Sequence, residues 1–312
     1  CLAAFESRHD YFRLAAQTSY AQILFLIPYR AEHVDERRRL AEIAEAAWAR
    51  VAGVLGTAPP LEVTQFPALL LDGFWERARV GATAARGVHV IWRHIADSVL
   101  VTLMAYRGEG DAADPLIQEL LPEGPATEPG NCLFLSGSHL QRLAAKLALD
   151  AHDLPMARAW LEAHDRWLEW SGAVLGQADG QLGWAAYHHA GGDRDASRRH
   201  AEQALALATD PRQPLALIAV HRFLGQLDSE ERRYADAEAH LQQSLALADA
   251  CAAPFERALT LLELAGLRAV QDKPDEARAL LQEIRAICEP LGAKPTLERV
   301  AALEQQLVGG GR

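Results

Sequence analysis

The chain has 312 residues, of which half are hydrophobic and 23% are charged, and its formal net charge at pH 7 is −11. This composition excludes a mainly disordered chain, because it supplies enough apolar side chains to build a core. An acidic chain repels polyanions on average, so direct contact with nucleic acid is not expected. The apolar share is mostly Ala and Leu, and alternating β-branched runs are scarce, which favours helices over a sheet.

The four cysteines, Cys1, Cys132, Cys251 and Cys288, lie far apart in the sequence. None stands in C-x-x-C spacing, so neither a zinc knuckle nor a redox pair is predicted. Without a signal-peptide pattern or an apolar run long enough to cross a membrane, the chain is predicted to be cytoplasmic and not to contact membranes. It starts at Cys1 rather than Met and ends in a glycine run, so we expect a fragment of something larger.

Residues 1–137 are predicted to be helical but irregular. The apolar run at 20–29 is expected to be the core of a helix, and the Pro- and Gly-rich stretch at 121–130 is the best loop candidate. The spacing of apolar and charged residues predicts further helices at 34–54, 74–80, 87–106 and 112–121. We interpret this part as degenerate hairpins of one solenoid with the rest of the chain; a separate helical domain is the alternative.

The second half of the sequence repeats itself every 40 residues. Units that begin at Ser138, Ala178, Ile218 and Ala258 follow one another without a gap. Small residues recur at their eighth position and again at their twentieth: Ala145, Ala185, Gly225 and Ala265, then Ala157, Ser197, Ala237 and Ala277. Small residues let two helices approach closely, so each unit is predicted to be a hairpin of two helices packed through these positions. A single hairpin leaves an apolar face uncovered, and the hairpins must therefore stack.

These observations predict an all-α fold, a right-handed α-solenoid of helix-turn-helix hairpins. Its four repeats are expected at 138–177, 178–217, 218–257 and 258–297, followed by a capping helix to residue 307 and a linker at 308–312.

The third unit resembles a tetratricopeptide repeat (TPR), because Leu224-Gly225, Tyr234 and Ala237 stand where that repeat has its Leu-Gly, Tyr and Ala. The period is longer than the usual value of about 34 residues. Longer repeats of this kind look like those in the sensor arm of MalT-like, large ATP-binding LuxR-type transcriptional regulators, which are signal-transducing ATPases with numerous domains (STAND). The resemblance covers 138–307 and implies a TPR-like sensor arm, with ATPase and helix-turn-helix modules elsewhere in the full-length protein.

In TPR-like arrays the first helix of each unit lines a concave surface, and the resemblance places the second, fifth, ninth and twelfth positions there. These positions give a groove with basic and polar side chains: His139, Arg142, Lys146, His189, Arg222 and Gln226. Arg142 and Lys146 are four residues apart and therefore adjacent on a helix. We expect the groove to bind an anionic group, such as a peptide carboxylate. The alternative is that these side chains only solvate a helix face.

No motif in the sequence predicts catalysis. A G-x-x-x-x-G-K-[ST] loop is absent, so no cofactor is expected on this chain, and ATP is expected only on a separate module. The segment Gly108-x-Gly110-x-x-Ala113 matches a relaxed dinucleotide fingerprint but follows a helical pattern, and it is predicted to be a turn between helices. His188 and His189 are adjacent and diverge on a helix, so no metal site is expected.

We therefore predict a protein that is not an enzyme. The leading hypothesis is a sensor arm of a larger signal-responsive transcriptional regulator, which binds a protein, a peptide or a small-molecule effector in its concave groove. The alternative is a free-standing cytoplasmic TPR scaffold or peptide receptor that mediates protein–protein interaction.

Overall fold

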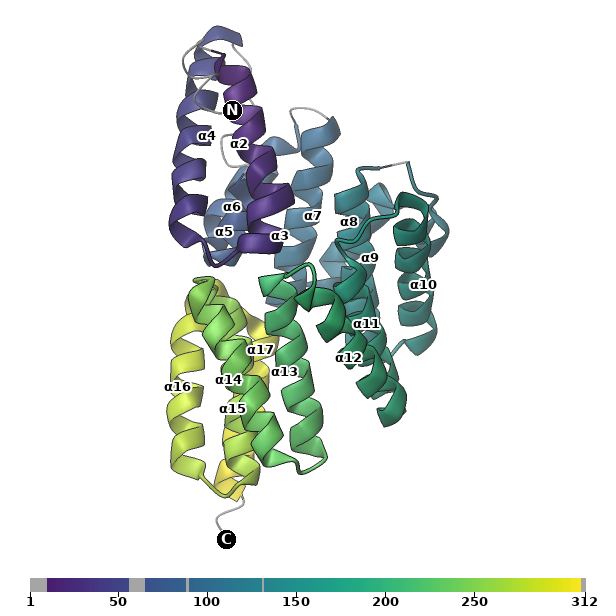
Figure 1. Ribbon diagram of the computed structural model, residues 1–312, viewed down its shortest axis with the longest axis vertical. Helices are drawn as coiled ribbons and strands as arrows, with labels where there is room; N and C mark the ends of the chain where they lie inside the picture. The colour runs from purple at the N-terminus through teal and green to yellow at the C-terminus, as the bar shows by residue number, and fades with distance from the viewer. Residues whose placement is uncertain (1–9, 56–64, 88–89, 131, 310–312) are drawn as a thin grey trace.

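The computed structural model describes residues 10–55, 65–87, 90–130 and 132–309. These ranges fold almost wholly into helices (Figure 1), and their only strand-like pairing is an isolated bridge between Thr209 and Arg212. The predicted all-α solenoid is therefore confirmed.

Four consecutive helix pairs form the second half of the chain, and a last helix follows them. Their bounds are α9 (Phe134–Asp150) with α10 (Leu154–Ser171), α11 (Gln177–Ala190) with α12 (Arg194–Thr209), α13 (Pro214–Glu230) with α14 (Tyr234–Ala250), α15 (Pro254–Val270) with α16 (Pro274–Leu291), and α17 (Lys294–Gly309). Helix α9 begins four residues before Ser138, where the sequence period was set. Helix α17 includes residues 308 and 309, which were predicted to belong to the linker. The other three linker residues lie outside the described part of the chain.

The turns inside the pairs repeat with the period of the sequence. Each contains one residue with positive φ, and these residues are spaced 40 apart: His152, Gly192, Arg232 and Asp272. In every turn the next N–H bonds to the carbonyl five residues back, as from Asp193 to His188 over 2.9 Å. A residue in the left-handed conformation followed by this hydrogen bond satisfies free carbonyls at a helix C-terminus. The 40-residue period is therefore the period of the hairpins.

The eight small residues of the repeat lie buried where the helices of a pair meet. Ser197 donates its hydroxyl to the carbonyl of Ala185 on the facing helix over 2.9 Å. A methyl group on Gly225 would lie 2.7 Å from Cγ of Leu241 on α14. At such distances a larger side chain would force the pair apart, which explains the small residues.

The first part of the chain forms shorter and less regular helices. They are α2 (Tyr11–Ala21), a π-helical turn η1 (Gln22–Leu26), α3 (Ile27–Arg30), α4 (Val34–Leu55), α5 (Phe66–Leu71), α6 (Trp75–Ala85), α7 (Val90–Arg107), α8 (Gly110–Leu120) and the 3₁₀ turn η3 (Gly124–Ala126). Gly108, at φ +74°, lies in the turn between α7 and α8. The interpretation of the dinucleotide-like motif as a turn is thus confirmed.

The expected helix core at 20–29 is only partly buried. The segment is helical, and Leu26 and Ile27 are buried, but Tyr20, Leu24 and Phe25 are exposed. The prediction was wrong for these three side chains, because an apolar run does not show which of its faces the rest of the chain covers.

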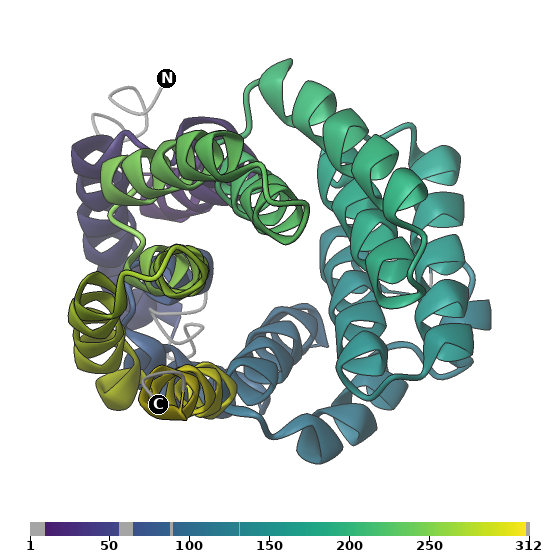
Figure 2. The same ribbon diagram turned by 90° about the horizontal axis from the view of Figure 1, so that it is seen from below.

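The helices close into a ring (Figure 2). Helix α7 contacts α9, and contacts then run from α9 to α11, α13, α15 and α17 in turn, until α17 contacts α7 again. We call these six the inner helices. The sequence analysis predicted α17 as a cap but gave α7 no place beside it. Closure therefore turns the expected concave groove into the inside of a ring.

Helices α2 to α6 lie over the turns of the later repeats, as Figure 1 shows for the purple helices above the green and yellow ones. Arg37 donates to the carbonyl of Cys251 over 2.8 Å, and Arg107 donates to that of Leu291 over 3.2 Å. These two carbonyls are 40 residues apart and end α14 and α16, where the helix dipole favours a cation. A single hydrophobic cluster joins Trp75 of α6 to Phe255 of α15.

Candidate ligand-binding site

Polar and aromatic contacts link neighbouring inner helices. Between α7 and α9, Thr102 Oγ1 lies 2.8 Å from His139 Nε2; between α11 and α13, His189 Nε2 lies 2.8 Å from a Glu230 oxygen. Arg222 of α13 donates to Glu256 of α15 over 2.7 Å. The rings of Tyr106 and Phe255, 4.9 Å apart, join α7 to α15. The inner helices thus form one connected frame.

The pKa of the Tyr106 hydroxyl depends on charged side chains of several inner helices. Burial raises the pKa of its hydroxyl most, and then the charges of Glu256, Arg222, Arg142 and Asp179 act on it. These four residues belong to four different helices, α15, α13, α9 and α11. Charges on four other inner helices therefore bear on this phenol.

Most of the predicted basic groove is paired with carboxylates. Lys146 Nζ lies 2.6 Å from Asp150, one turn further along its own helix. Arg222 pairs with Glu256, and His189 pairs with Glu230, whose other oxygen accepts from the Gln226 amide over 3.0 Å. The acidic partners of Arg222 and His189 lie on the first helix of the following helix pair, so helix periodicity within one pair did not indicate them.

His139 does not contribute a positive charge. Burial, followed by the charge of Arg142, lowers the pKa of its imidazole to about 3. It stays neutral at pH 7 and can donate its Nε2–H to the Thr102 hydroxyl oxygen, because the proton of that hydroxyl is donated to the Ser98 carbonyl. As a free basic surface, the predicted groove is therefore reduced to Arg142.

Arg142 and Asp179 make no ion pair, and the Tyr106 hydroxyl makes no hydrogen bond, within the described part of the chain. Arg142 makes one long hydrogen bond, 3.3 Å to the Ser138 hydroxyl, and no ion pair there. A Cβ on Gly176, the N-cap of α11, would lie 3.4 Å from its Nη1. Asp179 follows in the first turn of α11. The sequence analysis missed Tyr106, because only ring closure brings α7 beside the later repeats. It placed Asp179 on the concave surface, at the second position of its repeat, but not among the candidate site residues.

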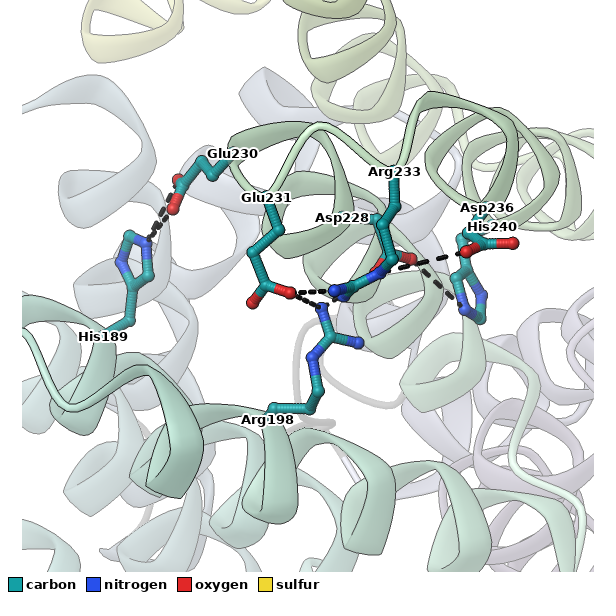
Figure 3. A network of polar contacts seen from close by, with 8 residues as sticks. All are labelled: His189, Arg198, Asp228, Glu230, Glu231, Arg233, Asp236 and His240. Atoms are coloured by element: carbon teal, nitrogen blue, oxygen red, sulfur yellow. Dashed lines mark hydrogen bonds and ion pairs between the residues drawn. The ribbon is translucent and has the colours of Figure 1, made fainter.

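A second polar network joins the outer ends of the middle repeats (Figure 3). Asp228, whose side chain is 2% exposed, accepts from Arg198 of α12 over 2.8 Å and from Arg233 of α14 over 2.5 Å. His240 Nε2 lies 3.7 Å from the same carboxylate. All partners of Asp228 come from adjacent helices and satisfy its charge, so this network is a joint between repeats rather than an open site.

Neither metal ligation nor cysteine chemistry marks the described residues. No three His, Cys, Asp or Glu side chains within 10–55, 65–87, 90–130 and 132–309 are placed to hold an ion. Burial raises the pKa of the Cys251 thiol to about 12 and that of Cys288 to about 11, so both stay protonated at pH 7. Over the same residues, no helix is both long and apolar enough to cross a bilayer.

Comparison with known proteins identifies the fold. No protein-family model and no curated protein matches the chain. Among solved structures, the chain is similar to a signal-transduction ATPase with numerous domains from Pyrococcus horikoshii that has a tetratricopeptide-repeat sensor. The TM-score is 0.56 and the identity 14%, over 96% of this chain and 43% of that one. It is also similar to a tetratricopeptide-repeat protein from Parabacteroides merdae, with a TM-score of 0.51 and 15% identity, over 94% of this chain and 99% of that one.

Both likenesses show the same class of fold, an α-solenoid of the tetratricopeptide-repeat kind. The chain spans less than half the length of the STAND protein. At these identities the likeness shows the fold alone.

Proposed function

We propose that this chain is a non-catalytic sensor arm, which binds an effector on its inner helices within a larger signal-responsive regulator. The observation that carries the proposal is Arg142 of the inner helix α9, a half-buried guanidinium with one long hydrogen bond and no ion pair within the described part of the chain. The likeness to a STAND protein with a TPR sensor supports the same role. In this proposal the regulator is MalT-like and of the LuxR type, and it lies in the cytoplasm. ATP and DNA are bound only by its attached modules.

Such an arm would act by a shift of populations. An effector changes the equilibrium only if it binds one arrangement of the repeats more tightly than another. The side chains that link α7, α9, α11, α13 and α15 come from different repeats, so a ligand among them bears on the angles between repeats. Attached modules would then sense the curvature of the ring.

The reading frame that encodes the chain tests this proposal. We expect it to encode a nucleotide-binding ATPase domain before Cys1 and a helix-turn-helix domain after Arg312. A frame that begins and ends with this chain would overturn the sensor-arm proposal.

A free-standing TPR scaffold is the second candidate, because the Parabacteroides merdae protein is matched over 99% of its chain. The scaffold proposal predicts that a peptide or protein partner binds the isolated chain and is lost on reversal of the charge at Arg142. Charge reversal at Lys146, which is already paired with Asp150, serves as the control. Equal binding by both variants would place the partner elsewhere.

A further inference from the structure

A cavity of about 340 Å³ lies among the helices α10, α11 and α12. Its volume is at the lower end of the range for small-molecule sites, about 300–1,000 Å³. None of its lining residues stands at a position that was predicted to face the concave groove. A ligand in this cavity would therefore bind apart from the surface proposed for the effector, whether or not that proposal holds.

The carboxylate of Asp165 in this cavity has no cationic partner. Its Oδ2 accepts from the Trp184 indole over 2.8 Å, and its Oδ1 has no hydrogen-bond donor within the described part of the chain. Burial is the largest cause that raises its pKa. Among the described residues, the other two aspartates whose pKa burial raises, Asp72 and Asp97, are both paired with arginine. Asp165 thus bears the cost of burial without the partner that offsets it elsewhere.

Glu169, four residues further along α10, brings a second carboxylate to the same cavity. Residues four apart are neighbours on a helix, so the two negative charges repel each other. The described residues that line the cavity include no lysine, arginine or histidine. Nor do the described ranges place a third His, Cys, Asp or Glu to complete a metal site. The cavity therefore favours a positive charge that an organic group carries.

Two aromatic side chains that do not line the cavity position two residues that do. Trp184 of α11 binds Asp165 of α10, and its ring stacks on that of His200 of α12 with the centroids 6.3 Å apart. His200 Nδ1 in turn lies 2.7 Å from Oε1 of Gln181. These contacts join all three helices, so the polar wall is preorganised rather than a set of separate surface side chains.

The rest of the lining supplies hydrogen-bond acceptors and two apolar side chains. Gln177 donates its amide N–H to the Ala173 carbonyl over 2.9 Å, which leaves its own carbonyl oxygen able to accept. Gln203 makes no hydrogen bond to the other described residues, and Leu168 and Leu207 offer methyl groups to an aliphatic chain. A guanidinium group has five N–H donors and no acceptor, so it fits a wall of carboxylate and carbonyl oxygens better than an ammonium group with three donors.

We propose that the cavity lined by Asp165, Glu169 and Gln177 binds an alkylguanidinium group. The guanidinium pairs with the two carboxylates and donates to the amide oxygens, while its aliphatic stem packs against Leu168 and Leu207. A free small cation and an arginine side chain of a peptide both carry this group, and they are the two sources that the experiment separates.

Calorimetric titration of the chain with butylguanidinium tests the site, and butylurea serves as its uncharged counterpart of similar shape. We expect butylguanidinium to bind with a Kd of about 1 mM or below and butylurea not to bind, because only the first pairs with the carboxylates. Asp165→Asn keeps an oxygen for the Trp184 indole and should raise the Kd at least about tenfold. Glu169→Gln should raise it about threefold, because Glu169 is exposed.

Glu162 provides the matched control. It lies on the same helix and has the same charge, but it is paired with Arg158 and does not line the cavity. Glu162→Gln should leave the Kd within about twofold of the wild-type value. An equal loss of binding in Glu162→Gln and Asp165→Asn would reduce the effect to net charge and overturn the site. Failure of butylguanidinium to bind, or equal binding of butylurea, would overturn it as well.

Titration with N-acetylarginine methylamide, which presents the same side chain on a peptide backbone, separates the two sources. Tighter binding than that of butylguanidinium assigns the site to an arginine of a protein partner, and weaker binding assigns it to a free small cation; both results support the site.

The stability of the free variants separates a binding role from a structural one. Without ligand, Asp165→Asn should melt no lower than the wild type, because it removes a half-buried charge that has no cationic partner. A lower melting temperature would give Asp165 a structural role, and the test then rests on the exposed Glu169. An unchanged Kd in Glu169→Gln would in that case overturn the site.

Discussion

Position eight of the repeat shows how closely a single residue is fitted to the hairpin. Three units have Ala there, and the third has Gly225, whose Cβ would lie 2.7 Å from Leu241 Cγ and 3.3 Å from the Ala237 carbonyl. Gly266, one position further along in the fourth unit, has no atom within 4 Å of its Cβ position. The two glycines lie in equivalent helices and have opposite surroundings.

Substitution of these two glycines by Ala should therefore shift stability in opposite directions. Gly225→Ala is expected to lower the free energy of unfolding by about 1–3 kcal/mol, because the added methyl overpacks the interface with α14. Gly266→Ala should raise it by about 0.5–1 kcal/mol through helix propensity. Urea unfolding of both variants measures the difference, and a loss of stability in both would contradict the distinction.

The role of a residue could be predicted from the sequence where its partner lies in the same hairpin, but not where its partner lies in another one. The recurring small residues indicated the packing of each pair, because both partners lie within one 40-residue unit. The partners of Arg222 and His189 lie in the following helix pair, and Tyr106 reaches Phe255 only through ring closure. Such contacts depend on how units are rotated against each other, which periodicity alone does not determine.

At the scale of helices, the repeats are alike in their turns and differ in the polar contacts that join them. Asp153 and Asp193 cap α10 and α12 through the backbone N–H groups of Met156 and Ala196. At the equivalent place α14 has Arg233, which instead binds the buried Asp228. The third repeat thus gives up a helix cap and gains a bond within the polar network around Asp228. Each junction between repeats therefore has its own polar contacts and can respond to pH in its own way.

The junction of α11 with α13 is expected to respond to pH. The hydrogen bond to Glu230 raises the pKa of His189, and the same bond lowers that of Glu230. The His189 contribution is therefore complete below the unfolded pKa of about 6.5 and is lost as pH rises through the higher folded pKa. The Glu230 contribution is lost only in acid, as pH falls through its lowered pKa. The pair should thus stabilise the junction most between about pH 4.5 and 6.5.

Melting temperatures of wild type and His189→Gln across this pH range check the expectation. The two proteins should differ most below the unfolded pKa of His189, and the difference should shrink as pH rises through its raised folded pKa. Because the side chains are 29% and 36% exposed, screening limits the effect to about 1 kcal/mol or less. Glu230→Gln should reproduce the loss, and added salt should reduce it. A difference that is constant with pH would assign the effect to packing.

At the scale of the whole molecule, ring closure depends on contacts between segments about 200 residues apart. The sequence indicated helices at 34–54, 87–106 and 112–121, and the structure has helices at nearly the same places. It did not indicate that their turns lie on those of the later repeats, because the early helices lack a regular period. The arginines that make these contacts, Arg37 and Arg107, have no special spacing in the sequence.

Arg37 is expected to be the strongest single contact between the early helices and the later repeats. Its side chain is 2% exposed, and it bonds the Cys251 carbonyl over 2.8 Å and lies 3.3 Å from Asp72. Burial raises the pKa of Asp72 despite the opposing charge of Arg37, so removal of the guanidinium leaves a poorly solvated carboxyl and an uncapped helix end. Arg37→Ala should lower the free energy of unfolding by about 3 kcal/mol.

Exposed Arg39, two residues further along α4, provides the matched control, and Arg39→Ala should change stability by less than about 0.5 kcal/mol. Hydrogen exchange distinguishes a local effect from a global one. In Arg37→Ala the amides of the turn at 251–253 should exchange faster than those of the turn at 191–193, because only the first turn lies under the early helices. Equal protection of both turns in this variant would mean that the early helices stay in place on the later repeats without Arg37, and that the apolar contacts around Trp75 and Phe255 hold them there.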